Sequence, residues 1–386
     1  MPPATPSLAE VASAPAETAV STGCRIAFCG PIAEPGRPAG GGYEAANRRT
    51  CDALARRGQQ VIERRYPHPA RSRWLKLAGY ASSFVRHAWW LLRRRADYDL
   101  LHLTPLNMHF ALAETVLVSC ARLAGKPVLV DVRAGTFVRH YEGGSALYRH
   151  TIDRTLRLAT QVAVEGPDYV TFVRRRTHRP VLHFPNYVDA PSLQRELPPR
   201  RFAAGDTLRL VYFGRLVPEK GVETALQALQ LLIARGRPAT LALIGDGPPE
   251  HVAQWRAQHA GLPVSWQAGL PMHELLARAA QAHVFIFPSR HDGEGHSNAL
   301  NEAMALGLVP VCSAQGFSRS VVGNAGIVLP VSATAADYAD AIDGLSAAGR
   351  WTKLSTRAAA RVRALYSEEA TLPALLDTYR RMLLTR

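Results

Sequence analysis

The sequence lacks the features that mark a membrane-spanning, zinc-binding or disulfide-bonded protein. Its five cysteines form no CxxC pair and leave an odd one over, which argues against a zinc site and a disulfide framework. The segment 1–23 contains no Lys or Arg, so it lacks the positive region of a secretory signal, and we expect a disordered tail there. No apolar run approaches the roughly 20 residues that span a bilayer. We therefore expect a cytoplasmic protein.

Acidic residues are scarce relative to basic ones. The chain of 386 residues has 46 Lys and Arg against 31 Asp and Glu, which gives a formal net charge of +15. Such a surface attracts phosphates, whether on nucleotides, nucleic acids or anionic lipids. With 47% hydrophobic and 20% charged residues, the composition is typical of a folded α/β protein. The length exceeds what one hydrophobic core usually organises, which favours two domains.

Short apolar runs alternate with helical patterns in two series. The first series predicts strands at 24–30, 60–63, 100–103, 128–132, 161–164 and 181–184. The second series predicts strands at 208–214, 240–244, 264–267, 284–287, 309–312 and 327–329. This alternation is typical of parallel sheets covered by helices. It predicts an α/β fold with two doubly wound, Rossmann-like domains that face each other across a cleft, where ligands of such sheets bind.

The predicted domain boundaries follow from the same pattern. An N-terminal domain is expected at 24–186, a polar linker at 187–205, and a C-terminal domain at 206–365. The remaining segment, 366–386, contains an amphipathic helix predicted at 368–384. This helix must pack against one of the two domains.

The segment 291–311 is predicted to form a loop, a short helix and a turn between two strands. Ser297 is a favoured N-cap residue, and Gly307 can adopt the left-handed conformation that ends a helix. The N-terminus of such a helix attracts phosphate. Asn298 and Glu302 lie one helical turn apart on the same face, and Glu294 reaches them from the loop. We therefore predict a polar pocket here rather than a solvated helix face.

A second segment, 211–229, also follows a predicted strand and begins a helix. Gly214 lies at the bend, and Arg215 and Lys220 flank the start of the helix. An arginine and a lysine in this place can neutralise a diphosphate without a metal ion. Taken alone, the segment is equally consistent with an exposed basic loop.

Three motifs together resemble the family 4 retaining glycosyltransferases of the GT-B fold, also called glycosyl transferases group 1. They are GRLVPEKG at 214–221, IGDGP at 244–248 and EGHSNALNE at 294–302, and PNYVD at 185–189 resembles the family's interdomain junction. The resemblance is strong in the C-terminal domain and weak in the N-terminal domain. It implies transfer of a hexose, with retention, from a UDP- or GDP-linked nucleotide sugar to a saccharide or lipid-linked saccharide acceptor. The product would serve polysaccharide or glycoconjugate synthesis.

The resemblance also implies roles for individual side chains. Arg215 and Lys220 would hold the donor diphosphate, Glu302 would bind the ribose hydroxyls, and Glu294 would contact the transferred sugar. We count Glu294, Arg215 and Lys220 as the predicted catalytic residues. No metal and no other cofactor is expected. The final helix would cross back onto the N-terminal domain.

Backbone groups complete the predicted donor site. The amides of Asn298 and Ala299 would assist in binding the phosphate and the sugar. In the N-terminal domain, Gly41 and Gly42 fit the family's glycine-rich loop, although a triple glycine is equally typical of a flexible connector.

The N-terminal domain departs from the family pattern at one strand end. Many members carry a histidine near the sugar there, whereas this sequence has Arg133. Arg133 and Asp131 are therefore candidates for the contact with the sugar. His140 and His109 are nearby alternatives, but a lone histidine is more often structural.

The stretch 64–95 contains nine Lys or Arg, no acidic residue and three of the six tryptophans. Helical spacing predicts an apolar face made of Trp74, Leu77, Ala81, Phe84, Val85, Ala88, Leu91 and Leu92, with Lys76, Ser83, Arg86 and Arg93 largely elsewhere. Two interpretations stay open. The helix can simply cover the sheet, or it can dock on an anionic membrane surface at the inner face of a membrane.

Two alternative functions fit parts of the sequence. A sugar-nucleotide epimerase or a phosphorylase can share the two-domain architecture. From a different class, a net charge of +15 is compatible with a basic nucleic-acid-binding protein. The arginines are scattered over both domains and no nucleic-acid motif appears, so we expect no nucleic-acid partner.

Overall fold

The computed structural model describes residues 23–35, 41–67, 73–193, 202, 205–347 and 349–384. The predicted tail at 1–23, except for Gly23, lies outside the described residues. Most of the predicted linker at 187–205 lies outside them as well.

The first sheet has six parallel strands in the order β2-β1-β3-β4-β5-β6. Its strands are β1 (Arg25–Gly30), β2 (Gln60–Arg65), β3 (Leu100–Leu103), β4 (Val128–Val132), β5 (Gln161–Val164) and β6 (Val181–His183). Every residue of β3, β4 and β5 is buried, as expected for central parallel strands covered on both faces.

The second sheet repeats this plan in the order β12-β11-β10-β7-β8-β9. Its strands are β7 (Leu208–Phe213), β8 (Ala239–Ile244), β9 (Val264–Gln267), β10 (Val284–Phe287), β11 (Val309–Ser313) and β12 (Ile327–Leu329). In both sheets the order in which strands are added switches to the other side of the first strand, between β1 and β3 in the first sheet and between β7 and β10 in the second. These are the points where open α/β sheets bind ligands.

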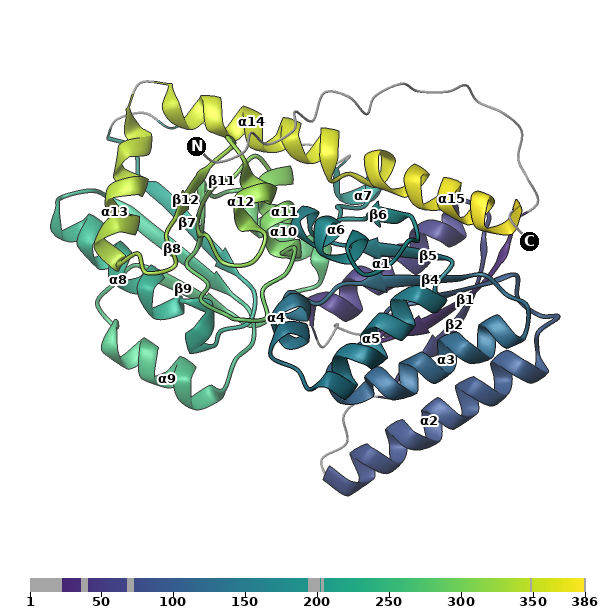
Figure 1. The fold of residues 1–386 in the computed structure, drawn as a ribbon. Coiled ribbons are helices and arrows are strands. Elements are labelled where there is room, and N and C mark those ends of the chain that lie inside the picture. Colours follow the sequence, from purple (N-terminus) through teal and green to yellow (C-terminus); the bar gives the residue numbers. More distant parts are fainter. Residues whose placement is uncertain are drawn as a thin grey trace, which may run out of the picture.

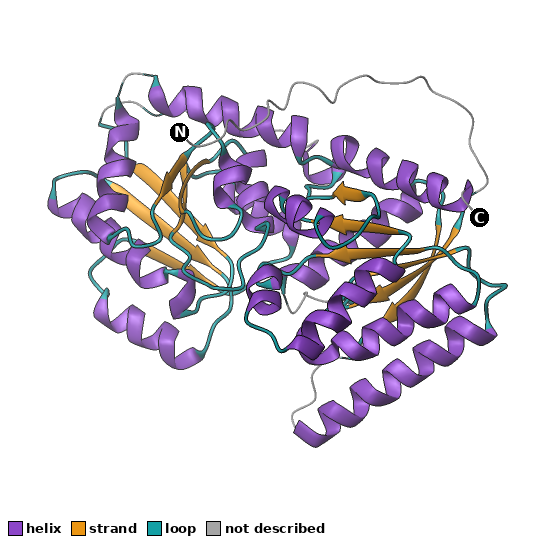
Figure 2. Cartoon of the chain, viewed as in Figure 1, coloured by secondary structure: helices purple, strands orange, loops and turns teal. Residues whose placement is uncertain are grey.

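Helices cover both faces of each sheet (Figure 2). Those of the first domain are α1 (Gly42–Arg56), α2 (Arg73–Arg93), η2 (Met108–Phe110), α3 (Ala111–Leu123), α4 (Phe137–Glu142), α5 (Ala146–Leu158) and α6 (Pro167–Arg174), followed by α7 (Ala190–Leu193) at the junction. Those of the second domain are η3 (Pro218–Lys220), α8 (Val222–Ala234), α9 (Pro249–Gln258), α10 (Met272–Ala279), α11 (Asn298–Ala305), α12 (Ser318–Val322), α13 (Ala335–Asp343), η4 (Gly344–Ser346) and α14 (Arg350–Leu365).

The predicted fold class is confirmed. All twelve strands lie where the apolar runs place them, and their ends differ from the prediction by at most two residues. The largest difference is in β2, which continues to Arg65 rather than Glu63. It does so because β2 pairs with β1 along its whole length, up to the pair Gly30 and Arg65.

The last helix, α15 (Glu368–Leu384), packs on the first domain. Figure 1 shows α14 and α15, in yellow, running along the second and then the first domain. Leu372, Leu375, Tyr379 and Met382 belong to one hydrophobic cluster with core residues of the first sheet. The Tyr379 hydroxyl lies 2.5 Å from His102 Nδ1, inside that core. The helix therefore ties the two domains together.

The predicted apolar face of α2 is partly wrong. Leu91 is buried, but Val85 and Leu92 are 69% and 43% exposed, whereas Ser83 is buried. Ser83 Oγ lies 3.2 Å from His87 Nε2, which also lies 3.1 Å from the Arg65 carbonyl oxygen. Ser83 and His87 thus form these hydrogen bonds inside the domain, and the side of α2 that carries them faces inward. The helical spacing of apolar residues alone therefore predicted the wrong inward face. Among the described residues, no helix is long and apolar enough to cross a membrane.

Candidate active site

A cavity of about 690 Å³ lies between the two domains, at the carboxyl ends of both sheets. The structure brings all eleven predicted site residues to its wall: Gly41, Gly42, Arg133, Gly214, Arg215, Lys220, Glu294, Ser297, Asn298, Ala299 and Glu302. The alternative candidates Asp131, His109 and His140 are not among the residues that line it. The predicted site residues therefore converge on one place, whereas Gly245, Asp246 and Gly247 of the IGDGP motif line a separate pocket.

Helix α11 presents its N-terminus to this cavity. Ser297 caps the helix as predicted, because its hydroxyl accepts a hydrogen bond from the Leu300 N–H at 3.4 Å. Gly307 ends the helical segment with a left-handed φ of 68°, also as predicted. Within the described part of the chain, the backbone N–H groups of Asn298 and Ala299 have no hydrogen-bond partner. These groups and the positive end of the helix form a site for an anion.

Glu294 and Lys220 form a buried ion pair at the centre of the cavity wall. Lys220 Nζ donates to Glu294 Oε2 at 2.6 Å, and their side chains are 12% and 7% exposed. The Ser289 hydroxyl donates to the same oxygen at 2.7 Å. The second domain thus holds a carboxylate next to a cation, and a polar ligand that contacts either group must compete with the other.

Arg215 supplies the second cation of this wall. Arg215 follows β7 at the bend made by Gly214. It is exposed, and it lines the cavity. Its guanidinium is 3.5 Å from His291 Nε2. Burial, followed by the positive charge of Lys220, lowers the pKa of His291, so the histidine does not add a further charge at neutral pH. Arg215 and Lys220 thus place two cations beside the cavity, of which Lys220 is already paired with Glu294.

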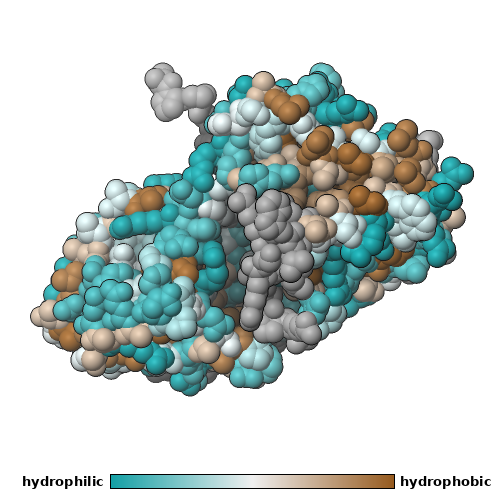
Figure 3. All heavy atoms as spheres, turned by 90° about the horizontal axis from the view of Figure 1, so that it is seen from below, coloured by the Kyte–Doolittle hydropathy of each residue, from teal (hydrophilic) through white to brown (hydrophobic). Residues whose placement is uncertain are grey.

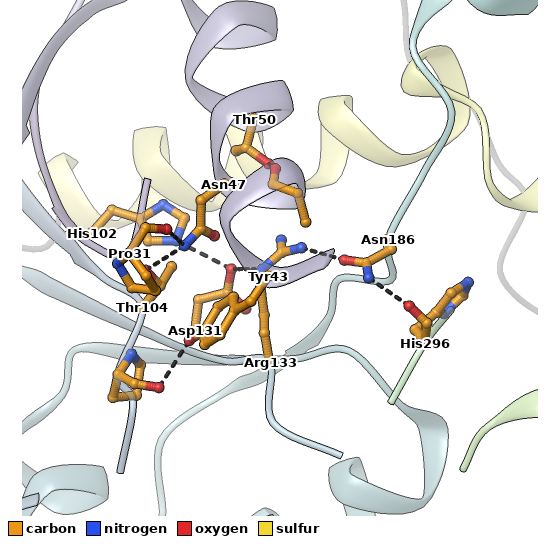
Figure 4. Close-up of polar contacts among 12 residues, drawn as sticks. Pro31, Tyr43, Asn47, Thr50, His102, Thr104, Asp131, Arg133, Asn186 and His296 are labelled. Carbon is orange, nitrogen blue, oxygen red and sulfur yellow. Dashed lines mark hydrogen bonds and ion pairs between the residues drawn. The ribbon is translucent and has the colours of Figure 1, made fainter. Parts of the chain in front are cut away.

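The wall from the first domain carries an ion network that no motif predicted as a unit (Figure 4). Arg133 Nε donates to Asp131 Oδ2 at 2.6 Å, and Arg133 Nη1 donates to Asn186 Oδ1 at 2.7 Å. Asn186 Nδ2 in turn donates to the His296 carbonyl at 2.6 Å, in the other domain. On its far side Asp131 Oδ2 lies 3.2 Å from His102 Nε2. The network crosses the junction between the domains.

The electrostatics of this network keep Asp131 ionised. Burial alone would raise the pKa of Asp131, but Arg133 and His102 outweigh that effect and lower it. Burial lowers the pKa of His102, which is therefore neutral at physiological pH. Arg133 Nη2 has no hydrogen-bond partner within the described residues, although Arg133 lines the cavity. Within the part of the chain that the structure describes, this atom is therefore a buried donor without a partner beside the cavity.

Glu165, directly after β5, is a cavity residue that sequence reasoning missed. It is 2% exposed, and its Oε1 has no hydrogen-bond partner in the described parts of the chain. Burial raises the pKa of Glu165 to about 8, against the lowering effects of Arg133 and of a hydrogen bond from the His296 backbone. Glu165 is therefore largely a neutral acid at pH 7.

A second missed residue is Arg49, on α1 of the first domain. Its Nη2 donates to Glu302 Oε1 at 2.7 Å. The apolar neighbours of Glu302 in its own helix predicted a contact with a polar group. Glu302 does contact a polar partner, but that partner, Arg49, comes from the other domain. No local pattern predicted this pairing, because the two residues are 253 positions apart.

The two walls touch each other directly. A Cβ atom on Gly135, after β4, would lie 2.3 Å from the Glu294 carbonyl oxygen, so only glycine permits this approach. Asn301 Nδ2 donates to the Asn186 carbonyl at 2.8 Å. The domains are therefore closed on each other at this side of the cavity.

Two facing doubly wound domains, with the cavity at the carboxyl ends of both sheets, define the GT-B architecture, and solved structures agree. Sucrose-phosphate synthase from Thermosynechococcus elongatus superposes with a TM-score of 0.70 and 19% identity, over 94% of this chain and 100% of that one. HepE of Anabaena, in complex with UDP-glucose, superposes with a TM-score of 0.65 and 15% identity, over 93% and 100%. At these identities the similarity shows the fold.

The sequence of the second domain matches a known family model. Residues 207–347 match the family model described as glycosyl transferases group 1. This match lies within the second domain, and it confirms the resemblance seen in the motifs of that domain.

Curated relatives match over part of their length. A GDP-mannose-dependent alpha-(1-6)-phosphatidylinositol monomannoside mannosyltransferase of Mycolicibacterium smegmatis is 32% identical over 186 residues, 42% of this chain and 49% of the relative. The O-antigen chain mannosyltransferase B of Escherichia coli is 34% identical over 122 residues, 31% of this chain and 32% of the relative. The chain spans about half the length of the first of these relatives.

Proposed function

We propose that the protein is a retaining, metal-independent glycosyltransferase. It transfers a hexose from a UDP- or GDP-linked sugar to a saccharide or lipid-linked saccharide acceptor. The observation that carries the proposal is the anion site at the start of α11, with Arg215 and Lys220 beside it and Glu294 within the same cavity. Relatives named as GDP-mannose-dependent mannosyltransferases support it, as does the UDP-glucose complex of a protein with the same fold.

The proposed chemistry breaks the bond between the anomeric carbon and the diphosphate and forms a bond from that carbon to the acceptor hydroxyl oxygen, whose proton passes to the departing diphosphate. Negative charge develops on the departing diphosphate, where Arg215, Lys220 and the N-terminus of α11 stabilise it. These protein cations take the place of a metal ion. When the diphosphate engages Lys220, Glu294 is released from its ion pair and can accept hydrogen bonds from sugar hydroxyls, which positions the sugar for attack.

A thermal-shift screen tests this proposal. UDP, GDP and ADP are each compared with their sugar-linked forms, and at least one nucleoside diphosphate should raise the melting temperature because it binds the folded state. Transfer of labelled sugar should follow for the nucleotide that binds. A protein that binds none of them, but shifts in a salt-sensitive way with duplex DNA or RNA, contradicts the proposal.

We also propose that the protein docks on an anionic membrane surface from the cytoplasmic side. Among the residues that the structure describes, eight of the twelve exposed large hydrophobic side chains lie on α2, η2, α3 and α5: Val85, Trp89, Leu92, Met108, Leu112, Val116, Leu123 and Leu147. Figure 3 shows hydrophobic side chains gathered over the first domain in a view from below. Exposed arginines lie among them, at 86, 93, 94, 95 and 122. Free cysteines fit a reducing compartment.

Liposome sedimentation tests the docking proposal. Vesicles that contain anionic lipid should sediment the protein at low salt, and neutral vesicles should sediment less of it, because each basic residue near the surface contributes about 1 kcal/mol. A Trp89→Ser variant should sediment less than the unsubstituted protein, since Trp89 is 57% exposed and prefers the interface. Equal sedimentation with neutral and anionic vesicles, or none, contradicts docking.

A further inference from the structure

One ion pair joins the two domains directly at a predicted donor residue, Glu302. Arg49 projects from α1, and Glu302 projects from α11 of the other domain. Their side chains are only 10% and 5% exposed, with 2.7 Å between Arg49 Nη2 and Glu302 Oε1. A pair this well buried is screened little by salt, so it acts as a strong constraint on how the domains meet.

The arginine is fixed by a second contact. Arg49 Nη1 donates to the Tyr187 carbonyl at 2.5 Å, and Tyr187 lies in the segment that joins the domains. The same nitrogen is 3.4 Å from Asn298 Oδ1, while Asn298 Nδ2 donates to the Gly42 carbonyl at 2.9 Å. The guanidinium therefore binds the junction and α11 together, which a lysine with its single ammonium group would do less well.

We propose that Arg49 is a positioning residue that acts through Glu302, holding this carboxylate for the ribose hydroxyls of the donor and coupling donor binding to closure of the two domains. The inference deepens the proposed function and rests on it for the nature of the ligand.

One oxygen of the Glu302 carboxylate remains for the ligand. Arg49 occupies Oε1, whereas Oε2 of Glu302 has no hydrogen-bond partner in the part of the chain that the structure describes. Glu302 also lines the cavity. A carboxylate held in this way can accept from a ribose hydroxyl without losing its charge partner. Its orientation depends on the closed arrangement, because Arg49 comes from the opposite domain.

Coupling then follows from linkage. If the pair forms only when the domains close, a nucleotide that needs Glu302 in this orientation binds the closed form more tightly and favours it. By the same reciprocity, loss of Arg49 weakens nucleotide binding even though Arg49 need not touch the nucleotide.

The neighbouring residue offers a matched control. Arg48 lies on the same helix, but its guanidinium pairs with Asp52 at 2.8 Å and with Glu63 at 2.7 Å, both inside the first domain. Arg48→Ala removes the same charge from the same helix without touching the other domain.

The experiment uses the full chain, with UDP and GDP as probes in calorimetry and the matching nucleotide sugar in kinetics. Arg49→Ala should weaken binding of the preferred nucleoside diphosphate about tenfold, within the usual range of coupling between sites. It should raise KM for the donor more than it lowers kcat. Arg49→Lys should recover part of the loss, and Arg48→Ala should bind like the unsubstituted protein.

Small-angle scattering of the ligand-free proteins provides an independent readout. Arg49→Ala should be more extended than Arg48→Ala, because the closed form has lost its cross-domain pair. A double-mutant cycle of Arg49→Gln and Glu302→Gln should show effects on binding that are not additive. Additive effects, or equal losses of nucleotide affinity in Arg49→Ala and Arg48→Ala, would overturn the inference.

The two proposals fail in different ways. If neither UDP nor GDP binds the unsubstituted protein, the proposed donor is wrong, while scattering still tests Arg49 as the contact that closes the domains. If a nucleotide binds and Arg49→Ala binds it equally well, the proposed function stands and the role of Arg49 is refuted.

Discussion

The two walls of the cavity are built in opposite ways. The wall from the second domain is built mainly from two segments, 212–220 and 287–302, each running from a strand end into a helix, and Met272 and Leu275 of α10 complete it. The wall from the first domain collects side chains from α1, from the end of β4 and from the end of β5, and Tyr43, Arg133 and Glu165 are far apart in the sequence. The first kind of wall is local in the chain, and the second is assembled only by folding.

Because of this difference, we expect the two walls to contribute differently to activity and to the stability of the fold. The second-domain wall offers Arg215, Lys220 and a helix N-terminus to an anion, and both members of its ion pair, Glu294 and Lys220, line the cavity. The first-domain wall contains a network of buried charges, in which Arg133 forms an ion pair with Asp131 at 2.6 Å. We expect substitutions on the first wall to affect folding as well as activity, and substitutions on the second to affect mainly activity.

The largest expected effect is that of Arg133→Met. Removal of the guanidinium leaves Asp131, which is fully buried, without its closest charge partner. Breaking one side of a buried pair costs roughly 3–5 kcal/mol, so the free energy of unfolding should fall by about that amount in urea denaturation. A loss below about 1 kcal/mol, as for an exposed pair, would erase the distinction between the walls.

Next in size is the loss of turnover in Glu294→Ala. We expect turnover to fall about 100- to 1,000-fold, because the sugar loses the side chain that positions it. Transfer of labelled sugar measures the effect. Asp292→Ala is the control, since Asp292 lies on the same loop with its side chain 73% exposed and should keep normal turnover. Full activity of Glu294→Ala would remove this residue from the site.

A smaller effect should appear in the pH dependence of stability. The carboxyl of Glu165 has a pKa of about 8 in the folded protein against 4.5 as the ordinary value. Between these limits the folded state keeps a proton that the unfolded state has lost, so this residue's contribution to stability declines as the pH rises and levels off above about 8.

Glu165→Gln isolates that contribution. Glutamine does not titrate, so the difference in melting temperature between the unsubstituted protein and the variant should change steadily from about pH 5 to about pH 8. Arg133, Asp131, Glu294 and His296 surround Glu165 and remain in both proteins. Glu114, whose pKa burial raises to about 7, also titrates in both, so the difference cancels it. A difference that does not vary with pH would mean that Glu165 is already ionised.

The smallest effect is expected at the rim. Arg139 Nη1 and Asp292 Oδ2 form a cross-domain ion pair at 2.9 Å, but the side chains are 56% and 73% exposed. Exposed pairs contribute about 0–1 kcal/mol, so Arg139→Ala should change neither the melting temperature nor nucleotide affinity measurably. An effect as large as that of Arg49→Ala would show that burial is not what separates the two cross-domain pairs.

The sequence predicted the parts of the molecule that depend on local pattern. Strands appear as apolar runs bounded by turns, and α11 is marked at both ends, by Ser297 and by Gly307. Arg215, Lys220 and Glu294 were predicted because each lies within a few residues of such a boundary. The cavity brings these residues together as the parallel topology requires.

The remaining features depend on contacts that no short window contains. Arg49 reads as one more surface arginine on α1, until folding places it against Glu302. Glu165 follows β5 like any polar residue after a strand, and its raised pKa results from burial between the domains. The inner face of α2 was misassigned for a related reason, because Ser83 and His87 satisfy each other and the Arg65 carbonyl within the domain. Long-range pairing of polar groups overrides apolar periodicity there.

The packing of α15 has a consequence for the order in which the protein is made. Domains usually fold as units during synthesis, the N-terminal one first. Here, residues of the first sheet pack against a helix that comes much later in the chain. His102 contacts Tyr379, 277 positions further on, and Leu372 and Leu375 belong to a hydrophobic cluster with residues of the first sheet. On the ribosome, the first domain to emerge is therefore the last to be completed, and its uncovered apolar surface must be protected while the second domain is translated.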